Sequence, residues 1–290
     1  MRRAWVLGIV AAAGVTVAAA GYQGQQQPQP LSITKVKDTL FVISGGGGNT
    51  AAYLAADGVV LVDTKLANYG QQILDQVKSV TSKPITHIIN THTHGDHVGS
   101  NEFFPATVDI VAHENTAASM AKMKNFAEPA TKHGMPDRTF TDRLTLLSGS
   151  DAIDLYYFGP AHTGGDAFVV FRNLRVMHSG DAFAGPQAPI MDANNGGSGI
   201  NYPGTLAEAA GGIKNVDVVI PGHSDVTNWQ AFIDYGEFIK SFVSSVEASA
   251  KAGRTPDEAL AGFQPAAKFK GYNMGRAKAN VDLIYKEVQK

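Results

Sequence analysis

The chain has 290 residues, a formal net charge of −2 and 44% hydrophobic residues. This composition excludes a collagen-like chain, an intrinsically disordered chain and a small disulfide-stabilised domain. The chain contains no cysteine, which excludes thiol nucleophiles, thiolate zinc sites and iron–sulfur clusters. The near-neutral charge provides no basic surface for nucleic acid, so we expect no nucleic-acid partner.

The first twenty residues differ from the rest of the chain. Arg2 and Arg3 precede an apolar run that ends in three alanines at residues 18–20. This pattern predicts a secretory signal peptide over residues 1–20, and hence a periplasmic or secreted protein with no stable membrane insertion after cleavage. The alternative is a retained membrane anchor, for which the run is short. Residues 21–31, rich in glutamine and proline, are predicted to be a flexible linker.

Residues 32–290 are predicted to form one domain, because no later linker or internal repeat interrupts them. Short apolar runs rich in β-branched residues predict strands, and apolar residues at helical spacing predict helices. The predicted strands are residues 39–43, 53–56, 59–62, 85–90, 152–158, 167–171, 175–178 and 216–220. The predicted helices are residues 68–80, 116–126, 228–250, a segment that begins at 255, and 275–288. This alternation indicates a layered α/β fold with sheets inside and helices outside.

Two local signals support these assignments. Asp57-Gly58 lies between two apolar runs, which is a strong signal for a hairpin turn. Thr255 and Glu258 have the spacing of a capping box, and Pro256 occupies the first helical position between them.

A cluster of metal-ligating residue types directly follows the predicted strand 85–90. Residues 91–97 read THTHGDH. His92 and His94 are two residues apart, so in an extended segment they point the same way. After the turn that Gly95 allows, Asp96 and His97 reach a neighbouring position. Imidazole nitrogen and carboxylate oxygen at this density suit zinc or a similar divalent metal.

Three further residues, His162, Asp181 and His223, share one local context. Each follows a short apolar strand and lies beside a glycine. Strand ends are where a sheet presents side chains to a shared cleft, so these residues are candidates for the same site. The remaining histidines are interpreted as packing or surface residues: His87, His113, His133 and His178.

With these motifs in place, the sequence resembles a known family. The string HTHGDH at residues 92–97, followed in order by His162, Asp181 and His223, is similar to the motifs of the metallo-β-lactamase superfamily. Asp63 matches that family's first motif, a structural aspartate at the end of a hairpin strand. The resemblance covers residues 31–235 and is specific for fold and metal site. It implies an αββα sandwich, in which two mixed β-sheets pack face to face and are flanked by helices.

The resemblance also implies a ligand set for two zinc ions, with other divalent metals open. The first ion would be held by His92, His94 and His162, the second by Asp96, His97 and His223, and Asp181 would bridge the two. The implied activity is metal-assisted hydrolysis of an acyl bond. In that reaction Asp96 orients the nucleophile or carries its proton.

One ligand position narrows the expected substrate. Where Asp181 stands, β-lactamases of this family usually carry cysteine or serine, whereas lactone and thioester hydrolases carry aspartate. We therefore expect a small-molecule lactone, ester or thioester as substrate. Two alternatives are a metallo-β-lactamase that hydrolyses β-lactam antibiotics, and a non-hydrolytic redox or metal-binding member of the superfamily. The oligomeric state stays open.

Two loops have both a functional and a structural interpretation. The segment Gly45–Gly48 is either a mobile flap over the cleft or an ordinary hairpin tip. Residues 193–202 form a long predicted loop, and long loops are often functional. Tyr202 at its end either donates a hydrogen bond to a substrate or oxyanion, or packs in the core.

Overall fold

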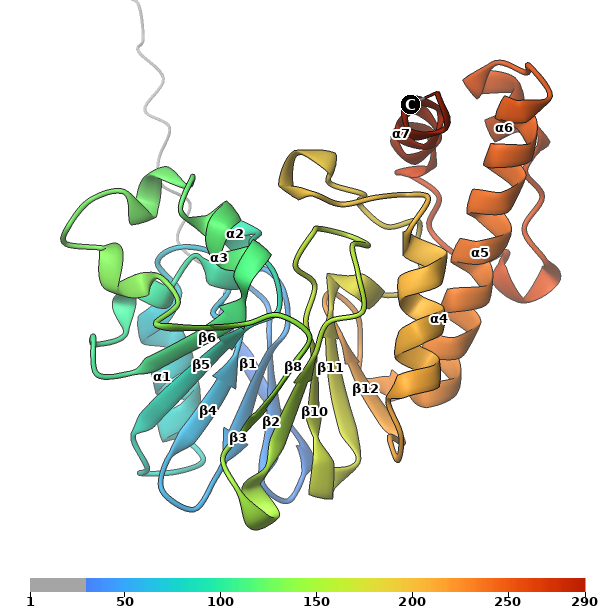
Figure 1. The fold of residues 1–290 in the computed structure, drawn as a ribbon. Helices are drawn as coiled ribbons and strands as arrows, with labels where there is room; N and C mark the ends of the chain where they lie inside the picture. Colours follow the sequence, from blue (N-terminus) through green and yellow to red (C-terminus); the bar gives the residue numbers. More distant parts are fainter. Residues whose placement is uncertain (1–29, 290) are drawn as a thin grey trace, which may run out of the picture.

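The computed structural model describes residues 30–289 of the chain (Figure 1). The predicted signal peptide and nearly all of the predicted linker lie outside the described residues. Within residues 30–289, no helix combines the length and the apolar character needed to cross a membrane.

Seven strands form the first sheet, and their order in the sheet follows the sequence. They are β1 (Ser32–Lys37), β2 (Leu40–Ser44), β3 (Thr50–Leu54), β4 (Val59–Val62), β5 (Ile85–Asn90), β6 (Asp109–His113) and β7 (Arg138–Phe140). Neighbouring strands from β1 to β4 are antiparallel, and those from β4 to β7 are parallel. The sheet is therefore mixed.

Six strands form the second sheet, in the order β13-β12-β11-β10-β9-β8. They are β8 (Arg143–Leu146), β9 (Ile153–Tyr156), β10 (Phe168–Phe171), β11 (Val176–Gly180), β12 (Val218–Pro221) and β13 (Thr227–Asn228). β11 and β12 pair in parallel, while the other neighbours are antiparallel. This sheet is also mixed.

Alternating side chains of the strands divide the core into layers. In β10, Val169 and Phe171 face the first sheet, where they join a buried cluster with Val60. Phe168 and Val170 point the other way and join the cluster beneath the helices. This alternation is the period of two that a strand buried on both faces requires. The core therefore lies both between the sheets and outside the second sheet.

Helices cover the outer faces of both sheets (Figure 1). The helices of the described residues are α1 (Gly70–Lys78), α2 (Gly95–Val98), α3 (Glu114–Met120), α4 (Tyr202–Gly212), α5 (Trp229–Lys251), α6 (Pro256–Gly262) and α7 (Ala277–Val288). α1 packs Ile73 and Val77 against the first sheet, and α4 and α5 cover the second. Two face-to-face sheets between outer helices make the αββα sandwich that the resemblance implies, and the predicted fold class is confirmed.

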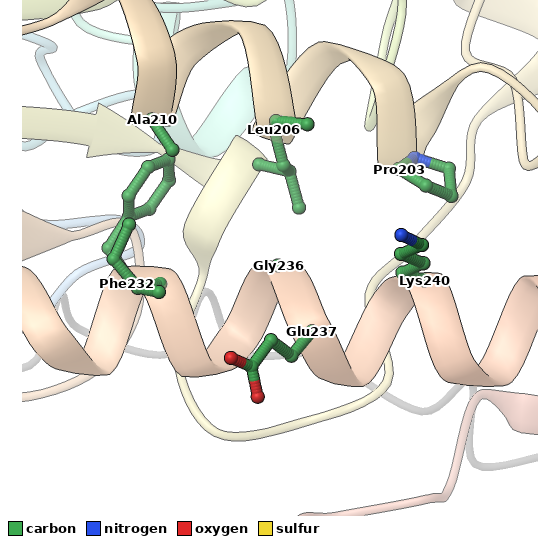
Figure 2. A pocket seen from close by; sticks show the side chains of 9 residues that line it. Pro203, Leu206, Ala210, Phe232, Gly236, Glu237 and Lys240 are labelled. Carbon is green, nitrogen blue, oxygen red and sulfur yellow. The ribbon is translucent and has the colours of Figure 1, made fainter.

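α4 and α5 pack along each other beside the second sheet. Leu206 of α4 points toward Gly236 of α5, and Phe232 lies under Ala210 (Figure 2). A small apolar groove of about 170 Å³ remains between the two helices. This contact holds α4 in place. The first residue of α4, Tyr202, lies close to the carboxyl end of β11.

Most predicted elements are present, but β1, β6, β7, β8, β13 and α2 were not predicted, and two longer helices also differ. β5 has the predicted bounds, and the capping box at Thr255 is formed by both of its hydrogen bonds. α3 ends at Met120 instead of 126, and a short 3₁₀ turn follows. α4 was not predicted, because a sequence with three glycines and several alanines carries no marked apolar periodicity.

Five strands of the two sheets point their carboxyl ends to one end of the sandwich. β4 and β5 are parallel neighbours in the first sheet, and β11 and β12 are parallel neighbours in the second. β9 is antiparallel to β10, as β11 is, so β9 and β11 also run the same way. The segments that follow these five strands contain all of the predicted metal ligands.

A buried aspartate ties β8, β9 and β10 together. The side chain of Asp154 is only 4% exposed and accepts hydrogen bonds from Thr145 at 2.6 Å and from Arg172 at 2.7 Å. Arg143 lies 3.3 Å away. Burial alone would raise the pKa of Asp154, but these contacts outweigh it and the pKa lies below its ordinary value.

We predict that Asp154→Asn lowers the free energy of unfolding by about 1–3 kcal/mol at pH 7, the value of hydrogen bonds to a charged group. Because folding lowers the pKa of Asp154, its contribution is complete above about pH 4 and is lost as the pH falls through the folded-state value. Denaturant unfolding with a chelator present checks both points. The control is Asp217→Asn, which breaks an exposed pair with Arg175 and should lower the free energy of unfolding much less than Asp154→Asn does. Equal losses in the two variants would contradict the prediction.

Candidate metal centre

Seven side chains from the segments that follow four of these strands, β5, β9, β11 and β12, meet at one end of the sandwich. They form two groups in which the candidate ligand atoms lie within 4.8 Å of one another: His92, His94, His162 and Asp181, and Asp96, His97 and His223. These are the seven residues predicted as metal ligands. The structure brings all of them together and divides the histidines as the resemblance implies.

Ring nitrogens approach one another closely within each group. His94 Nδ1 lies 3.0 Å from His162 Nε2, and His97 Nε2 lies 3.3 Å from His223 Nε2. The ring of His92 lies edge-on to the rings of both His94 and His162. Each group therefore presents several imidazole nitrogens to one small volume, as a tetrahedral metal site requires.

Asp181 lies between the two groups. Its Oδ1 is 3.4 Å from His97 Nε2, and its Oδ2 is 3.6 Å from His162 Nε2 and 3.2 Å from His223 Nε2. A Cβ added at Gly222 would overlap Oδ1 of Asp181, so only glycine lets β12 end this close to the carboxylate. One carboxylate thus faces both histidine groups, which is the position of a bridging ligand.

Two buried polar atoms in this centre have no hydrogen-bond partner among the described residues. They are His92 Nε2 and Asp181 Oδ1. A buried polar atom without a partner costs about 1–3 kcal/mol, so it indicates a ligand that is not part of the polypeptide. A divalent cation would satisfy an imidazole nitrogen and a carboxylate oxygen at the same time. The donor set and these two atoms fit a metal.

Carboxylates and carbonyls behind the histidines fix which ring nitrogen faces the centre. Asp63, at the end of β4, lies 2.7 Å from His97 Nδ1 and accepts two further hydrogen bonds from Thr91. Asp192 lies 2.8 Å from His94 Nε2. The Nδ1 of His162 donates to a backbone carbonyl at 2.7 Å. The remaining nitrogen of each ring is therefore free for a metal, an arrangement typical of metal-binding histidines.

The two histidine groups differ in protonation. Burial lowers the pKa of His162 to about 4, and burial together with neighbouring histidines holds the pKa of His92 well below its ordinary value. For His223, burial lowers the pKa, but hydrogen bonds to Asp181 and Asp96 outweigh it and raise the value to about 9. The pKa of His97 is raised in the same way by Asp181 and Asp63. In the metal-free protein, His92 and His162 are therefore neutral, whereas His97 and His223 are protonated.

A buried lysine holds the glycine loop against the centre. Lys65 is fully buried, and its Nζ donates to the carbonyl oxygens of Ile43 at 2.8 Å and Gly48 at 2.7 Å. Gly48 in turn donates to the carbonyl of Asp96 at 3.1 Å, and a Cβ at Gly48 would overlap the His97 ring. Burial lowers the pKa of Lys65 to about 7. In this structure the loop is a packed hairpin tip that supports two ligands.

Tyr202 does not belong to the centre. It is the first residue of α4 and is fully buried. Its hydroxyl lies 3.1 Å from the carbonyl oxygen of Asp181 and 3.2 Å from that of Ala182, so its proton is directed to the backbone. The expectation that Tyr202 donates a hydrogen bond to a substrate does not fit this geometry. The residue packs behind Asp181 instead.

The four other histidines lie outside the two groups, as predicted. His113 and His133 bond to backbone carbonyls, and His87 to the Thr86 side chain. His178 is fully buried and contacts the carbonyl of Asn49 at 3.1 Å.

A cavity of about 270 Å³ opens onto the centre. Its lining residues are His94, Asp96, Asp181, Ala184, Gln187, Ile190, His223 and Arg276. Sequence analysis did not find Asp192, Lys65 or Arg276. Asp192 and Lys65 contact residues that are distant in the sequence, Arg276 lines the cavity, and none of the three lies in a motif that would have indicated it.

The difference in protonation generates a prediction for metal binding. Protons compete with a metal for imidazole, so the affinity of the Asp96–His97–His223 group should fall as the pH drops below about 9, by up to about tenfold per pH unit for each proton displaced. The His92–His94–His162 group should keep its ion to lower pH, since the pKa of His162 is about 4. Cobalt(II) titrations followed by visible absorption check this order. Loss of both ions over one pH interval would contradict it.

The two supporting carboxylates generate a second prediction. Asp192→Asn should weaken divalent-metal binding mainly in the group that contains His94, and Asp63→Asn mainly in the group that contains His97, each by about 10- to 100-fold. Competition with a chelating dye, with circular dichroism to verify folding, measures both. If either variant weakened the two groups equally, the assignment of these supporting roles would be wrong.

Comparisons with known proteins agree with this geometry. The family model described as the metallo-β-lactamase superfamily matches residues 45–223, which contain all seven ligand candidates. A 2,4-dinitroanisole O-demethylase alpha subunit from Nocardioides sp. (strain JS1661) is 30% identical over 174 residues, which are 58% of this chain and 51% of that protein. The chain thus spans about half the length of this relative.

Two metallo-β-lactamases resemble the chain over a larger part of their length. The type 2 enzyme of Elizabethkingia meningoseptica is 24% identical over 239 residues, which are 78% of this chain and 91% of that enzyme. The solved structure of a metallo-β-lactamase from Pontibacter korlensis matches with a TM-score of 0.63 and 20% identity, covering 72% of this chain and 99% of that one. The chain therefore belongs to the metallo-β-lactamase superfamily.

Proposed function

We propose that this protein is an exported dinuclear zinc hydrolase that cleaves an acyl bond of a lactone, ester or thioester. The observation that carries the proposal is the position of Asp181, one carboxylate that faces two separate histidine groups. A single-metal site would need only one of these groups. Export is supported by the apolar run that follows Arg2 and Arg3.

The donor set supports zinc in both positions. Five imidazoles and two carboxylates, with no thiolate, suit zinc more than the softer metals. The first ion would be held by His92, His94 and His162, the second by Asp96, His97 and His223, and Asp181 would be shared. Two zinc ions, when bound, supply a water of lowered pKa as nucleophile and stabilise charge on the carbonyl oxygen.

The residues of this chain supply orientation and proton transfer. Asp96 lines the cavity with its side chain 29% exposed and lies 3.2 Å from His223. Burial would raise the pKa of Asp96, but His223 and His97 outweigh it and keep the carboxylate ionised. An ionised carboxylate at the cavity wall accepts a hydrogen bond from the nucleophilic water and orients it toward the acyl carbon. Asp63 and Asp192 keep the histidine rings aligned behind it.

Two features support an oxygen or sulfur leaving group on a small substrate. A bridging carboxylate reduces the Lewis acidity available at the second position, where a departing nitrogen anion would need most stabilisation. The cavity of about 270 Å³ lies just under the usual range for ligand pockets, which favours a small acyl compound.

A second candidate function has its own support. Several relatives, including the type 2 enzymes of Elizabethkingia meningoseptica and Bacteroides fragilis, are named metallo-β-lactamases. A β-lactamase would use the same seven ligands and differ in the leaving group. The two candidates therefore predict different substrate preferences for one metal centre.

The test is a substrate panel on the mature protein, loaded with zinc and after chelation. The panel contains a short acyl lactone, a nitrophenyl ester, a glutathione thioester, a chromogenic cephalosporin and 2,4-dinitroanisole. We predict close to two zinc ions per chain and hydrolysis of at least one of the first three compounds, with loss of activity on chelation and weak cephalosporin turnover. A His133→Ala control, altered outside the centre, should keep both metal content and activity.

Two results would overturn the proposal. The first is a protein without bound metal after growth with zinc, whose thermal stability is also unchanged by chelation. The second is efficient cleavage of the cephalosporin alone, which would select the β-lactamase candidate.

A further inference from the structure

The C-terminal segment forms one wall of the cavity. Asn273 accepts a hydrogen bond from the amide of Ala188 at 2.8 Å and donates one to the carbonyl of Pro186 at 3.1 Å. Asn280, buried in α7, donates to the carbonyl of Pro189 at 2.9 Å. These contacts fix the start of α7 against residues 186–190, of which Gln187 and Ile190 line the cavity. Of the lining residues, only Arg276 lies beyond the family match, which ends at residue 223.

Arg276 is the cationic side chain in that wall. It precedes α7 and lines the same cavity as Asp96, Asp181 and His223. Within residues 30–289, no side chain or backbone group forms a hydrogen bond or ion pair with its guanidinium, and no other arginine or lysine lines the cavity. A guanidinium is a rigid bidentate donor for carboxylates, and here its donors are free.

The carboxylates already in the cavity are engaged elsewhere. Oxygens of Asp96 and Asp181 each lie 3.2 Å from His223 Nε2, on the side of the metal centre. Arg276 therefore has no partner of its own in the cavity, although it faces a space that admits a ligand. The Arg276 side chain is exposed at the cavity, so its guanidinium is accessible to a carboxylate of a molecule that binds there.

The lining of the cavity is partly apolar. Ala184 and Ile190 line it, and the carbonyl of Ile190 also bonds His162 at 2.7 Å. The segment 184–190 thus touches the metal centre at one point and the start of α7 at another. The cavity therefore combines metal-ligating residues, apolar side chains and one guanidinium, which suits a short acyl compound that carries a negative charge.

From this arrangement we propose that Arg276 forms an anion subsite that binds a carboxylate on the substrate, separate from the bond that is cleaved. The inference rests on the proposed acyl hydrolysis and narrows its substrate class to small acyl compounds that carry a free carboxylate. Arg276 then selects the substrate rather than taking part in the chemical step.

Two matched esters test the subsite. They are 4-nitrophenyl hydrogen adipate, which carries a free carboxylate, and 4-nitrophenyl hexanoate, which carries a methyl group in its place. The wild type should prefer the anionic ester. Arg276→Gln should lower kcat/KM for the anionic ester by about 10- to 100-fold, the loss of a charge-assisted hydrogen bond, through KM. The same substitution should change kcat/KM for the neutral ester by less than about twofold.

Two further variants separate a charge effect from a structural one. Arg276→Lys should recover part of the preference, because it restores the charge without the bidentate fork. Lys270→Gln removes a charge from an exposed residue of the same segment that does not line the cavity. It should leave kcat/KM unchanged for both esters. An unchanged preference in Arg276→Gln, or an equal loss in Lys270→Gln, would overturn the subsite.

A binding measurement keeps the subsite separate from the proposed function. Calorimetric titration with adipate should show about 10- to 100-fold weaker binding to Arg276→Gln than to the wild type, at low ionic strength, with and without zinc. Adipate binding that depends on Arg276, in a protein that cleaves neither ester, would support the subsite and reject acyl hydrolysis. Cleavage of both esters with the same ratio in the two proteins would reject the subsite and leave acyl hydrolysis standing.

Discussion

The constraint on which this structure depends is the burial of several ionisable groups at one end of a β-sandwich. His92, His97, His162 and Asp181 are almost completely buried, and burying such groups is costly unless each has a partner. The segments at the strand ends supply these partners. Asp63 lies behind His97, Asp192 behind His94, and Asp181 between the two histidine groups. The atoms left without a partner, His92 Nε2 and Asp181 Oδ1, face the place where a cation would bind. The sandwich thus provides a rigid frame that keeps these charges apart from water and in contact with one another.

Much of this centre could be predicted from sequence, because its ligands lie where strands end. The bounds of β5 and the following THTHGDH run were clear from local pattern alone, and His162, Asp181 and His223 each follow an apolar run beside a glycine. The supporting residues could not be found in this way. Asp192 reaches His94 across 98 positions of sequence, and Lys65 is an isolated lysine until the fold buries it. Tyr202 looked accessible at the end of a loop, but α4 begins there and draws its ring into the core. Local sequence pattern therefore predicts which residues end a strand. The residues that hydrogen-bond to those ligands depend on contacts between distant segments, which local pattern does not show.

The candidate metal ligands and the proposed anion subsite come from different parts of the chain. All seven ligand candidates lie within the residues that match the family, and they follow strands that the sandwich needs for its own stability. Arg276, just before α7, lines the same cavity but lies beyond that match. We propose that substrate preference depends on this C-terminal segment, while the chemistry depends on the residues at the strand ends. Membership of the superfamily therefore identifies the metal centre but not the substrate. The features that bear on the substrate are Asp181, the cavity and Arg276.

The central claim is that two metal ions share Asp181. Anomalous diffraction at the zinc edge, on crystals of the mature protein grown with zinc, tests it most directly. The account predicts two anomalous peaks about 3.5–4 Å apart, one ligated by His92, His94 and His162 and the other by Asp96, His97 and His223, with Asp181 bound to both. A single peak at full zinc occupancy, or two peaks with Asp181 bound to only one of them, would contradict the account.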